Sequence, residues 1–362
     1  MTRLRQTSID RNINHDAEKG VSWFSSMVDC VRGGESLSTS QAEEMMELVV
    51  RSPLPGELIE SYLRALADKG EDVGELVGSA RCLRRHAAPF TAKGESIDNC
   101  GTGGDGAGTF NISTVAALVV AAVGQPVVKH GNRSASGHVG SADLLEALGV
   151  AVDLARAAAQ ESLDRYNFTF LFAPQYHPAA KSVAAIRRTI GRPTIFNLIG
   201  PLCNPAQPEY QLLGVPNADA AEKVAHAILQ LGVRRAFIVT GPGGVDELIP
   251  SGSNCVLVIE GGLIRRTVFS ACEAGMAECS LESLRGGDVE RNAAIAVEVL
   301  NGTAGGARDA VVFNAGAALF CTGMAESLAS GCAKCANAID QGLARTLLGD
   351  LRTFGRQAER AK

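Results

Sequence analysis

Apolar residues recur at helical spacing from about residue 21 to residue 90, separated by short polar breaks. The stripes are Met45, Met46 and Val49 behind a Ser40–Glu43 capping box; Leu58, Ile59, Tyr62, Leu63 and Leu66, stopping at Lys69-Gly70; and a segment from about Val73 to Arg84. Each stripe is one face of an amphipathic helix. The pattern therefore predicts a small helical bundle whose stripes form its core.

From about Ile97 the pattern changes to short β-branched segments that alternate with alanine-rich helical stretches. The expected strands are Pro126–Val128, Phe168–Phe172, Ala236–Thr240 and Cys255–Ile259, and the helices between them include Ala142–Leu148 and Ala220–Leu231. This alternation is typical of an α/β domain. The polar, proline-containing segment Pro178–Pro205 is the expected crossing between the two domains.

Composition narrows the class of protein. The 362 residues are 46% hydrophobic and 20% charged, which is ordinary for a globular enzyme, and the net charge of −5 argues against a general nucleic-acid surface. Residues 1–20 resemble neither a signal peptide nor a membrane anchor, so we expect a cytoplasmic protein. The ten cysteines form no framework, and Cys332 and Cys335 have no second pair at zinc spacing.

The segment Asp98–Thr114 places five glycines between two apolar stretches. Glycine permits positive φ and lets main-chain N–H groups approach an anion, and Asn111 to Thr114 then open a helix whose N-terminus favours negative charge. A glycine-rich turn alone can be only a tight turn. However, Lys129 to Ser134 supply positive charge after the next apolar segment. Two such loops favour a phosphate-binding site for a small ligand.

Two adjacent carboxylates, Asp246 and Glu247, follow another predicted strand. Beside a phosphate-rich ligand they indicate Mg²⁺, although an exposed acidic loop would have the same spacing. We find no nucleophile elbow, zinc-protease motif or P-loop lysine. The groups present suit a reaction in which the protein mainly positions substrates and stabilises charge.

Taken in order, these motifs closely resemble the anthranilate phosphoribosyltransferase family. They are Gly-Thr-Gly-Gly-Asp (101 to 105), Asn-Ile-Ser-Thr (111 to 114), Lys-His-Gly-Asn-Arg (129 to 133), Gly-Ser-Ala-Asp (140 to 143), His-Pro-Ala (177 to 179), Phe-Asn-Leu-Ile-Gly-Pro-Leu-Cys-Asn-Pro (196 to 205), Asp-Glu (246 and 247), Gly-Gly-Asp (286 to 288) and Asn-Ala (314 and 315). The resemblance extends from about Ser22 to Phe354.

The resemblance implies transfer of a 5-phosphoribosyl group from phosphoribosyl pyrophosphate to the amine of anthranilate, a step of tryptophan biosynthesis. It also implies a homodimer. The net charge argues against a nucleic-acid partner, and the longest apolar run, Val115–Val123, is too short to span a membrane. The resemblance further implies a small N-terminal α-helical domain, residues 1–90 with a contribution from about 184–207. Residues 91–362 would form a larger α/β domain with a central mixed sheet, as in nucleoside phosphorylases and phosphoribosyltransferases.

The family's site residues carry over by matching motif. Phosphoribosyl pyrophosphate would be held by Gly101, Gly104, Asp105, Thr109, Asn111, Ile112, Ser113, Thr114, Lys129, His130, Gly131, Asn132, Arg133, Ser134, Ala135, Ser136, Gly137 and Ser141. Two Mg²⁺ ions per subunit would be bound with Ser113, Asp246 and Glu247. Asn132, Arg187 and the Gly101 backbone would hold anthranilate, with His130, His177 and Pro201 lining its channel. Lys129 would stabilise the departing pyrophosphate.

One position departs from the family pattern, and three other readings stay open. His138 stands where the family usually has lysine, so a permanent charge becomes a titrating one. Pyrimidine nucleoside phosphorylases share the architecture but lack the Asp246–Glu247 pair and the Arg187 segment. A paralogous transferase acting on another aromatic amine would have the same motifs. A ligand-binding regulator would have a broken metal or phosphate motif, and both are intact.

Overall fold

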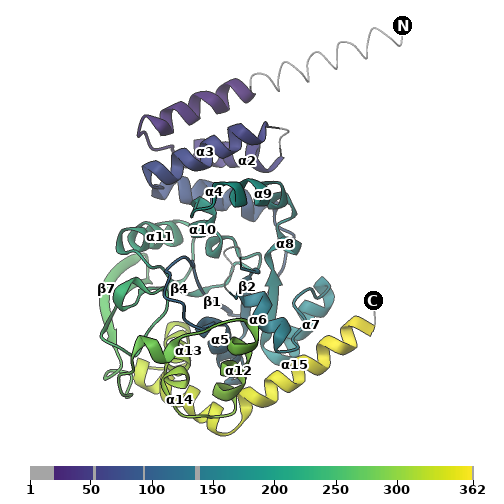
Figure 1. The fold of residues 1–362 in the computed structure, drawn as a ribbon, viewed down its shortest axis with the longest axis vertical. Coiled ribbons are helices and arrows are strands. Elements are labelled where there is room, and N and C mark those ends of the chain that lie inside the picture. The colour runs from purple at the N-terminus through teal and green to yellow at the C-terminus, as the bar shows by residue number, and fades with distance from the viewer. Residues whose placement is uncertain (1–19, 52–53, 93, 135–138, 361–362) are drawn as a thin grey trace. The chain divides into compact units, whose positions relative to one another are not determined.

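The computed structural model describes residues 20–51, 54–92, 94–134 and 139–360, which form two compact units (Figure 1). The helical unit comprises the residues up to His86 together with Ala179–Ile199, and the α/β unit comprises Ala87–Pro178 and the chain from Gly200 onward. The fold class expected from the sequence, a small helical domain plus a larger α/β domain with a mixed sheet, is confirmed. In the described residues we find no helix long and apolar enough to cross a bilayer.

The helical unit is built from the amphipathic stripes. Its helices are residues 20–32, α2 (Thr39–Arg51), α3 (Gly56–Lys69), α4 (Val73–His86), α9 (Lys181–Ile190) and α10 (Ile195–Ile199). The capping box expected at Ser40 and Glu43 is wrong, because the observed one lies two residues earlier in the chain. The Ser38 amide donates to the Gln41 side chain and the Gln41 amide to the Ser38 hydroxyl, so Ser38, not Ser40, caps α2. The sequence signal was ambiguous because Gln41 follows Ser38 by three residues, just as Glu43 follows Ser40. In the structure Glu43 pairs with Arg85 of α4 instead.

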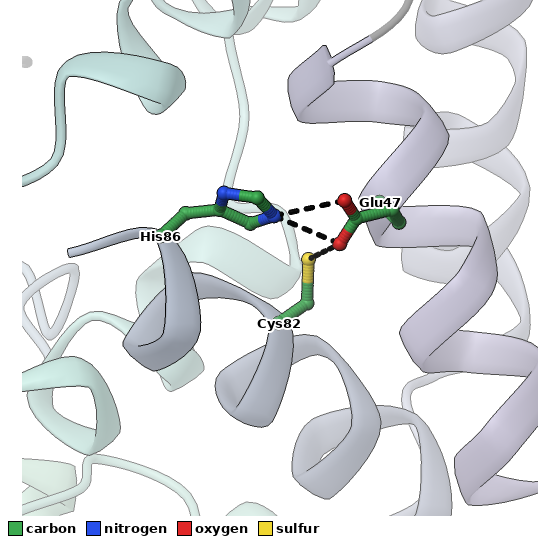
Figure 2. Close-up of side chains that lie close together, drawn as sticks. All are labelled: Glu47, Cys82 and His86. Carbon is green, nitrogen blue, oxygen red and sulfur yellow. Dashed lines mark hydrogen bonds and ion pairs between the residues drawn. The ribbon is translucent and has the colours of Figure 1, made fainter.

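Helices α2 and α4 pack closely, and polar side chains join them. Figure 2 shows Glu47 of α2 facing Cys82 and His86 of α4. Cys82 and His86 are four residues apart and so lie on one face of their helix. The carboxylate of Glu47 therefore links the two helices.

The α/β unit has a seven-stranded sheet in the order β3-β2-β1-β4-β5-β6-β7. The strands are β1 (Ile97–Gly101), β2 (Val127–Gly131), β3 (Phe168–Phe172), β4 (Tyr210–Gly214), β5 (Arg235–Thr240), β6 (Ser253–Glu260) and β7 (Leu263–Ser270). The first five are parallel, and β6 and β7 form an antiparallel hairpin on β5. Strand order reverses between β1 and β4, the place where open α/β sheets usually bind ligands.

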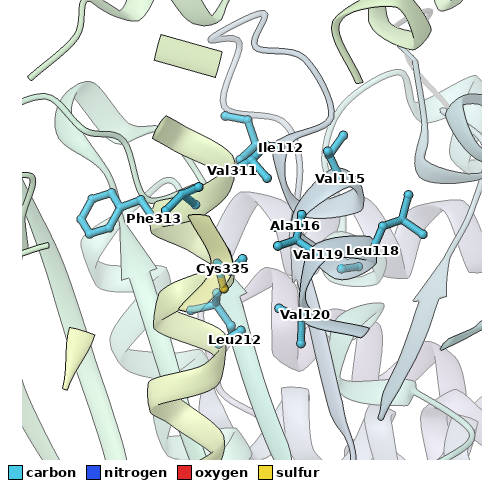
Figure 3. Packing of buried hydrophobic residues seen from close by; sticks show 14 of the residues in the cluster. Ile112, Val115, Ala116, Leu118, Val119, Val120, Leu212, Val311, Phe313 and Cys335 are labelled. Carbon is cyan, nitrogen blue, oxygen red and sulfur yellow. The ribbon is translucent and has the colours of Figure 1, made fainter. Parts of the chain in front are cut away.

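The helices of this unit pack around the sheet, and one of them, α5 (Ile112–Ala122), is central. The others are α6 (Ser141–Ala147), α7 (Arg156–Tyr166), α8 (Ala173–Tyr176), α11 (Ala218–Gln230), α12 (Val289–Leu300), α13 (Gly306–Thr322), α14 (Leu328–Asp340) and α15 (Leu343–Arg360). Helix α5 is largely apolar on every side, and Figure 3 shows Ile112 and Ala116 on the side of the helix that faces Val311 of α13. Burial on all sides fixes the N-terminus of α5, which begins where the glycine-rich loop ends.

Candidate active site at the carboxyl ends of the parallel strands

The glycine-rich loop follows β1 and is tied down at its far end. Gly103, Gly104, Gly106 and Gly108 have φ between 67° and 83°, a region that glycine alone enters freely. The Phe110 amide donates to the Leu284 carbonyl (3.0 Å), and the Gly286 amide donates to the Gly108 carbonyl (2.9 Å). Thr109 forms a β-bridge with Arg285. The segment 284–286 is therefore part of the site's framework, a role that its Gly-Gly-Asp motif did not disclose.

The loop meets the predicted metal ligands. The Gly103 amide donates to Asp246 Oδ2 (2.6 Å), and the Ser113 amide donates to Glu247 Oε1 (3.0 Å). Asp105 lies beside them, since its Oδ2 accepts from the Asp246 amide at 3.4 Å. Asp246 is only 8% exposed, so these residues do not form a solvated acidic loop. The structure therefore brings together Ser113, Asp246 and Glu247.

Burial and repulsion from neighbouring carboxylates raise the pKa of both carboxyl groups. Burial is the larger cause for each, with repulsion from Glu247 and Asp105 for Asp246 and from Asp105 for Glu247. The hydrogen bond from Ser113 and the charge of Lys129 act in the opposite direction on Glu247. Two carboxyl groups that are difficult to ionise at the same time favour a bound cation, because the charge of the cation stabilises both carboxylates.

Two glycines on neighbouring strands make room for Asp246. A Cβ atom on Gly101 would lie 2.1 Å from Asp246 Oδ2, and one on Gly214 would lie 1.5 Å from the Asp246 carbonyl oxygen. Gly101 is not among the glycines at positive φ, so its requirement is one of space. These close approaches join the ends of β1 and β4 to the carboxylate loop.

The second expected phosphate loop follows β2 and is fastened to α6. The guanidinium of Arg133 donates to Asp143 Oδ1 (3.1 Å) and to Glu146, and it lies 5.7 Å from the centre of the Phe172 ring. The amides of Ser134 and Gly140 donate to Asp143 Oδ2 at 3.1 and 2.9 Å. The charge of Arg133 is thus already paired. The predicted ligand residues Ala135, Ser136 and Gly137, like His138, lie outside the described residues.

The remaining predicted phosphate-side residues lie around these two loops. Gly104 is exposed, Asn111 donates to the Val139 carbonyl (2.7 Å), and Ile112 and Thr114 are buried in α5. Gly131 ends β2, next to the exposed Asn132, whose carbonyl accepts from the Ser141 hydroxyl at 3.3 Å. These two loops therefore touch through Asn111 and Val139.

Lys129 lies inside the protein, beneath these loops. It is 1% exposed, and its Nζ donates to the main-chain oxygen of Asn99 at 2.5 Å. Its charge counteracts the effect of burial on the pKa of Asp98 and of Glu247. Asn99, which sequence reasoning missed, also donates to the Ser113 carbonyl (2.8 Å). Lys129 therefore supplies positive charge to the buried carboxylates.

Three of the predicted anthranilate residues lie close together in the α/β unit. The rings of His130 and His177 are edge to face with centroids 5.1 Å apart, and the His130 ring donates to the main-chain oxygen of Gly200. Burial, with smaller effects of His177 and Lys129, lowers the pKa of His130 to about 3, so its ring is neutral at pH 7. Pro201 follows Gly200 directly.

Arg187 belongs to the helical unit, on α9. Its guanidinium lies 5.2 Å from the centre of the Phe196 ring, and burial lowers its pKa. Within the described ranges it has no ion pair, whereas Arg192 donates to Asp68 Oδ1 at 2.5 Å. Without the family resemblance, the sequence does not distinguish Arg187 from Arg188 or Arg192. In the structure Arg188 is exposed, whereas Arg187 is half-buried and has no carboxylate partner among the described residues.

Glu47, Cys82 and His86 have ligand atoms within 4.8 Å of one another, as a metal site would need (Figure 2). However, Glu47 already accepts from Arg85 Nη2 at 2.7 Å and pairs with Arg51 Nε at 2.9 Å. Burial and the neighbouring Glu47 carboxylate raise the pKa of the Cys82 thiol to about 12. Two cations and an un-ionised thiol suit an interhelical ion-pair network better than a metal centre.

Comparison with known proteins decides the family. The glycosyl transferase family helical bundle domain matches residues 26–87, and the glycosyl transferase family a/b domain matches residues 93–345. The anthranilate phosphoribosyltransferase of Moorella thermoacetica is 46% identical over 319 residues, which cover 88% of this chain and 94% of the relative. This chain belongs to the anthranilate phosphoribosyltransferase family. The family expected from the sequence motifs is confirmed.

Solved structures of this family share the fold. The anthranilate phosphoribosyltransferase of Thermus thermophilus is 38% identical, with a TM-score of 0.85 over 91% of this chain and 99% of that one. The enzyme of Saccharomyces cerevisiae, solved in complex with phosphoribosyl pyrophosphate and Mg, is 25% identical, with a TM-score of 0.81 over 89% and 94% of the two chains. The chain is therefore a glycosyltransferase of this family in both sequence and fold.

Proposed function

We propose that this chain carries out its family's reaction, the transfer of a 5-phosphoribosyl group to the amine of anthranilate, at the carboxyl edge of the sheet. The supporting observation is that Asp246 and Glu247 accept hydrogen bonds from Gly103 and Ser113, so the carboxylates and the phosphate-type loop form one site. Such a site suits a ligand that carries both phosphate and a divalent cation.

The donor, phosphoribosyl pyrophosphate, would lie against the main-chain amides of the glycine-rich loop and the N-terminus of α5. The remaining expected ligands are the loop residues after β2. Asp246, Glu247 and the Ser113 hydroxyl offer the oxygen donors that Mg²⁺ prefers, and we propose that they hold two ions in each subunit. Bound Mg²⁺ would neutralise charge on the departing pyrophosphate. Lys129 adds a buried positive charge to the same site.

The acceptor, anthranilate, would be bound through its carboxylate by Arg187 and through polar groups of Asn132 and the Gly101 backbone. The guanidinium fork of Arg187 matches a carboxylate. The neutral ring of His130 and the ring of His177, with Pro201, would line the approach. In the reaction the bond from the ribose C1 to pyrophosphate breaks and a bond from C1 to the amine nitrogen forms. The amine releases its proton to solvent, and no strong base is needed because the aromatic amine is neutral at pH 7.

The test is loss of anthranilate fluorescence with phosphoribosyl pyrophosphate and Mg²⁺, in wild type and in Asp246→Asn/Glu247→Gln. The matched control is Asp350→Asn/Glu359→Gln, which removes two exposed carboxylates of α15. We expect the control to keep full activity and the site variant to lose at least about a thousandfold. Donor binding without anthranilate turnover would instead favour the paralogous transferase, and a panel of aromatic amines would identify its acceptor.

The homodimer expected from the resemblance and the cytoplasmic location expected from the N-terminal sequence also belong to this proposal, as do the domain bounds 1–90 with 184–207 and 91–362. Light scattering coupled to gel filtration tests the dimer. The expected result is twice the mass of one chain at micromolar concentration, and a stable monomer with full activity would contradict it.

A further inference from the structure

Buried polar side chains from three adjacent strands contact one segment of the chain. They are His130 on β2, Asp98 on β1 and Gln211 on β4, and the segment is Gly200–Asn204, where the chain enters the α/β unit. Asp98 and Gln211 face each other in the register of β1 and β4. Ile97 pairs with Val127, so Asp98 pairs with Val128, and His130 is two residues further on the same face of the sheet.

Each of these side chains binds the segment directly. The His130 ring donates to the Gly200 carbonyl, Gln211 Nε2 donates to the Pro201 carbonyl (2.9 Å), and Asp98 Oδ2 accepts from Asn204 Nδ2 (2.8 Å). The segment is therefore hydrogen-bonded to three successive strands.

Asn204 completes the anchor from the segment's side. Its Nδ2 donates to the Val128 carbonyl at 2.8 Å as well as to Asp98, and its Oδ1 accepts from the Ala206 amide at 2.9 Å. Asn204 is 1% exposed and Asp98 is fully buried. Asp98 also accepts from the His130 amide at 3.3 Å. Both side chains of the Asn204 and Asp98 pair are thus satisfied by each other and by the backbone.

A buried polar group is costly unless its partner is correctly placed, so such a network fixes position more narrowly than apolar packing does. An apolar side chain would bury equally well at positions 98 and 211 in the middle of a parallel sheet. The His130 ring is held to the same segment through its hydrogen bond to Gly200.

We propose that Asp98, Asn204 and Gln211 are positioning residues for the acceptor half of the site. They hold Gly200–Asn204 against the sheet, and this fixes Pro201 and the orientation of the His130 ring, the two groups that would line the approach of the acceptor. The inference rests on the proposed function for its choice of acceptor, but the anchoring itself can be measured without catalysis.

The first experiment replaces Gln211 by methionine, which keeps the length of the side chain and removes its donor. The matched control is Gln125→Met, because Gln125 is a buried glutamine (4% exposed) just before β2 whose Nε2 donates to main-chain oxygens of Glu95 and Pro126, outside the Gly200–Asn204 segment. Hydrogen exchange of the 200–206 peptide is followed by mass spectrometry. We expect at least about tenfold faster exchange there in Gln211→Met and no change in Gln125→Met.

The kinetic arm compares the KM values for the two substrates. Gln211→Met should raise the anthranilate KM about tenfold and change the phosphoribosyl pyrophosphate KM by less than about twofold. Equal effects on both KM values, or the same effects in Gln125→Met, would overturn the proposal. If the wild type does not use anthranilate, the proposed function fails, while the exchange measurement still tests the anchor.

An exchange of partners gives a second test that does not depend on Gln211. Asp98→Asn and Asn204→Asp each break the carboxylate–amide pair, whereas the double variant restores it and loses only the hydrogen bond to the Val128 carbonyl. We expect each single variant to raise the anthranilate KM and the double variant to recover at least half of the loss on a logarithmic scale. Strictly additive effects of the two substitutions would contradict a positioning pair.

Discussion

At the scale of single residues, the position of Asp246 is set by two glycines that are distant from it in sequence. Gly101 and Gly214 end neighbouring parallel strands, and neither tolerates a Cβ atom against Asp246. The contact at Gly214 is with the backbone of Asp246, which cannot rotate away as a side chain could. The loop that carries Asp246 and Glu247 can therefore occupy its position because β4 ends in glycine.

Gly214→Ala should displace Asp246 and with it the hydrogen bond from Gly103. We expect a loss of about 3 kcal/mol in the free energy of unfolding and about a hundredfold loss of activity, because small displacements of catalytic groups are costly. Urea unfolding and the fluorescence assay measure the two effects. Gly349→Ala is the control, since a Cβ atom added to Gly349 of α15 would meet no atom within 4 Å; it should stabilise by about 0.5–1 kcal/mol. Unchanged activity in Gly214→Ala would show that the loop adapts.

At the scale of elements, the pairing of α2 with α4 depends on one carboxylate with several donors. Burial alone would raise the pKa of Glu47, but hydrogen bonds from Arg85 and His86 outweigh it and lower the pKa to about 2. The side chain of Glu47 is 24% exposed, so solvent screens only part of this effect. A carboxyl group with a lowered pKa stabilises the fold above its unfolded pKa and loses this contribution as the pH falls through the folded value.

Glu47→Gln should therefore reduce the free energy of unfolding by about 1–2 kcal/mol at pH 7. The difference from wild type should shrink between about pH 4.5 and pH 2, as the wild-type carboxylate becomes protonated. Thermal melts across this range measure it. Glu44→Gln, an exposed position on α2, serves as the control and should change little at any pH. A pH-independent difference for Glu47→Gln would mean that shape, not charge, joins the helices.

The scale of elements also shows what the sequence could and could not predict. Period and capping signals located the helices of the first unit within a few residues, but a second serine at the same spacing hid the true cap at Ser38. Strands β1, β4 and β7 were not predicted. β1 is short and largely polar, β4 has only five residues, and β7 carries the adjacent Arg265 and Arg266 in a largely exposed strand, so none of the three has a strong signal.

For the site, the order of the motifs was sufficient to name the residues but not their partners. The sequence placed Asp246 and Glu247 after a strand, and the structure joins them to Gly103 and Ser113. Arg133 was expected to face phosphate, yet it pairs with α6, because partners ten or more residues away leave no local pattern. The anchor at Asn204 went unnoticed for the same reason.

At the scale of the whole molecule, none of the ten cysteines forms a disulfide, and they differ mainly in access to solvent. Cys272 is exposed, whereas Cys321, Cys332 and Cys335 are buried, and burial raises the pKa of each of these three thiols. The Cys332–Cys335 pair is thus part of the core between α13 and α14.

A thiol reagent such as DTNB should therefore modify Cys272 first in the native protein, with the buried thiols reacting only on unfolding. Cys272→Ser should abolish the fastest phase and leave catalytic activity unchanged. Persistence of that phase in the variant would mean that one of the half-buried cysteines is more accessible than its surroundings indicate.

The hairpin of β6 and β7 has a practical consequence for work on this enzyme. Its two-residue turn, Gly261-Gly262, has both residues at positive φ, and Glu260 beside it pairs with Arg235, the first residue of β5. The turn thus lies at the amino edge of the parallel strands, opposite the loops that form the candidate site. A peptide tag or fluorescent reporter inserted there would be tethered at the far end of the sheet, where it can follow the enzyme's folding while leaving turnover measurable.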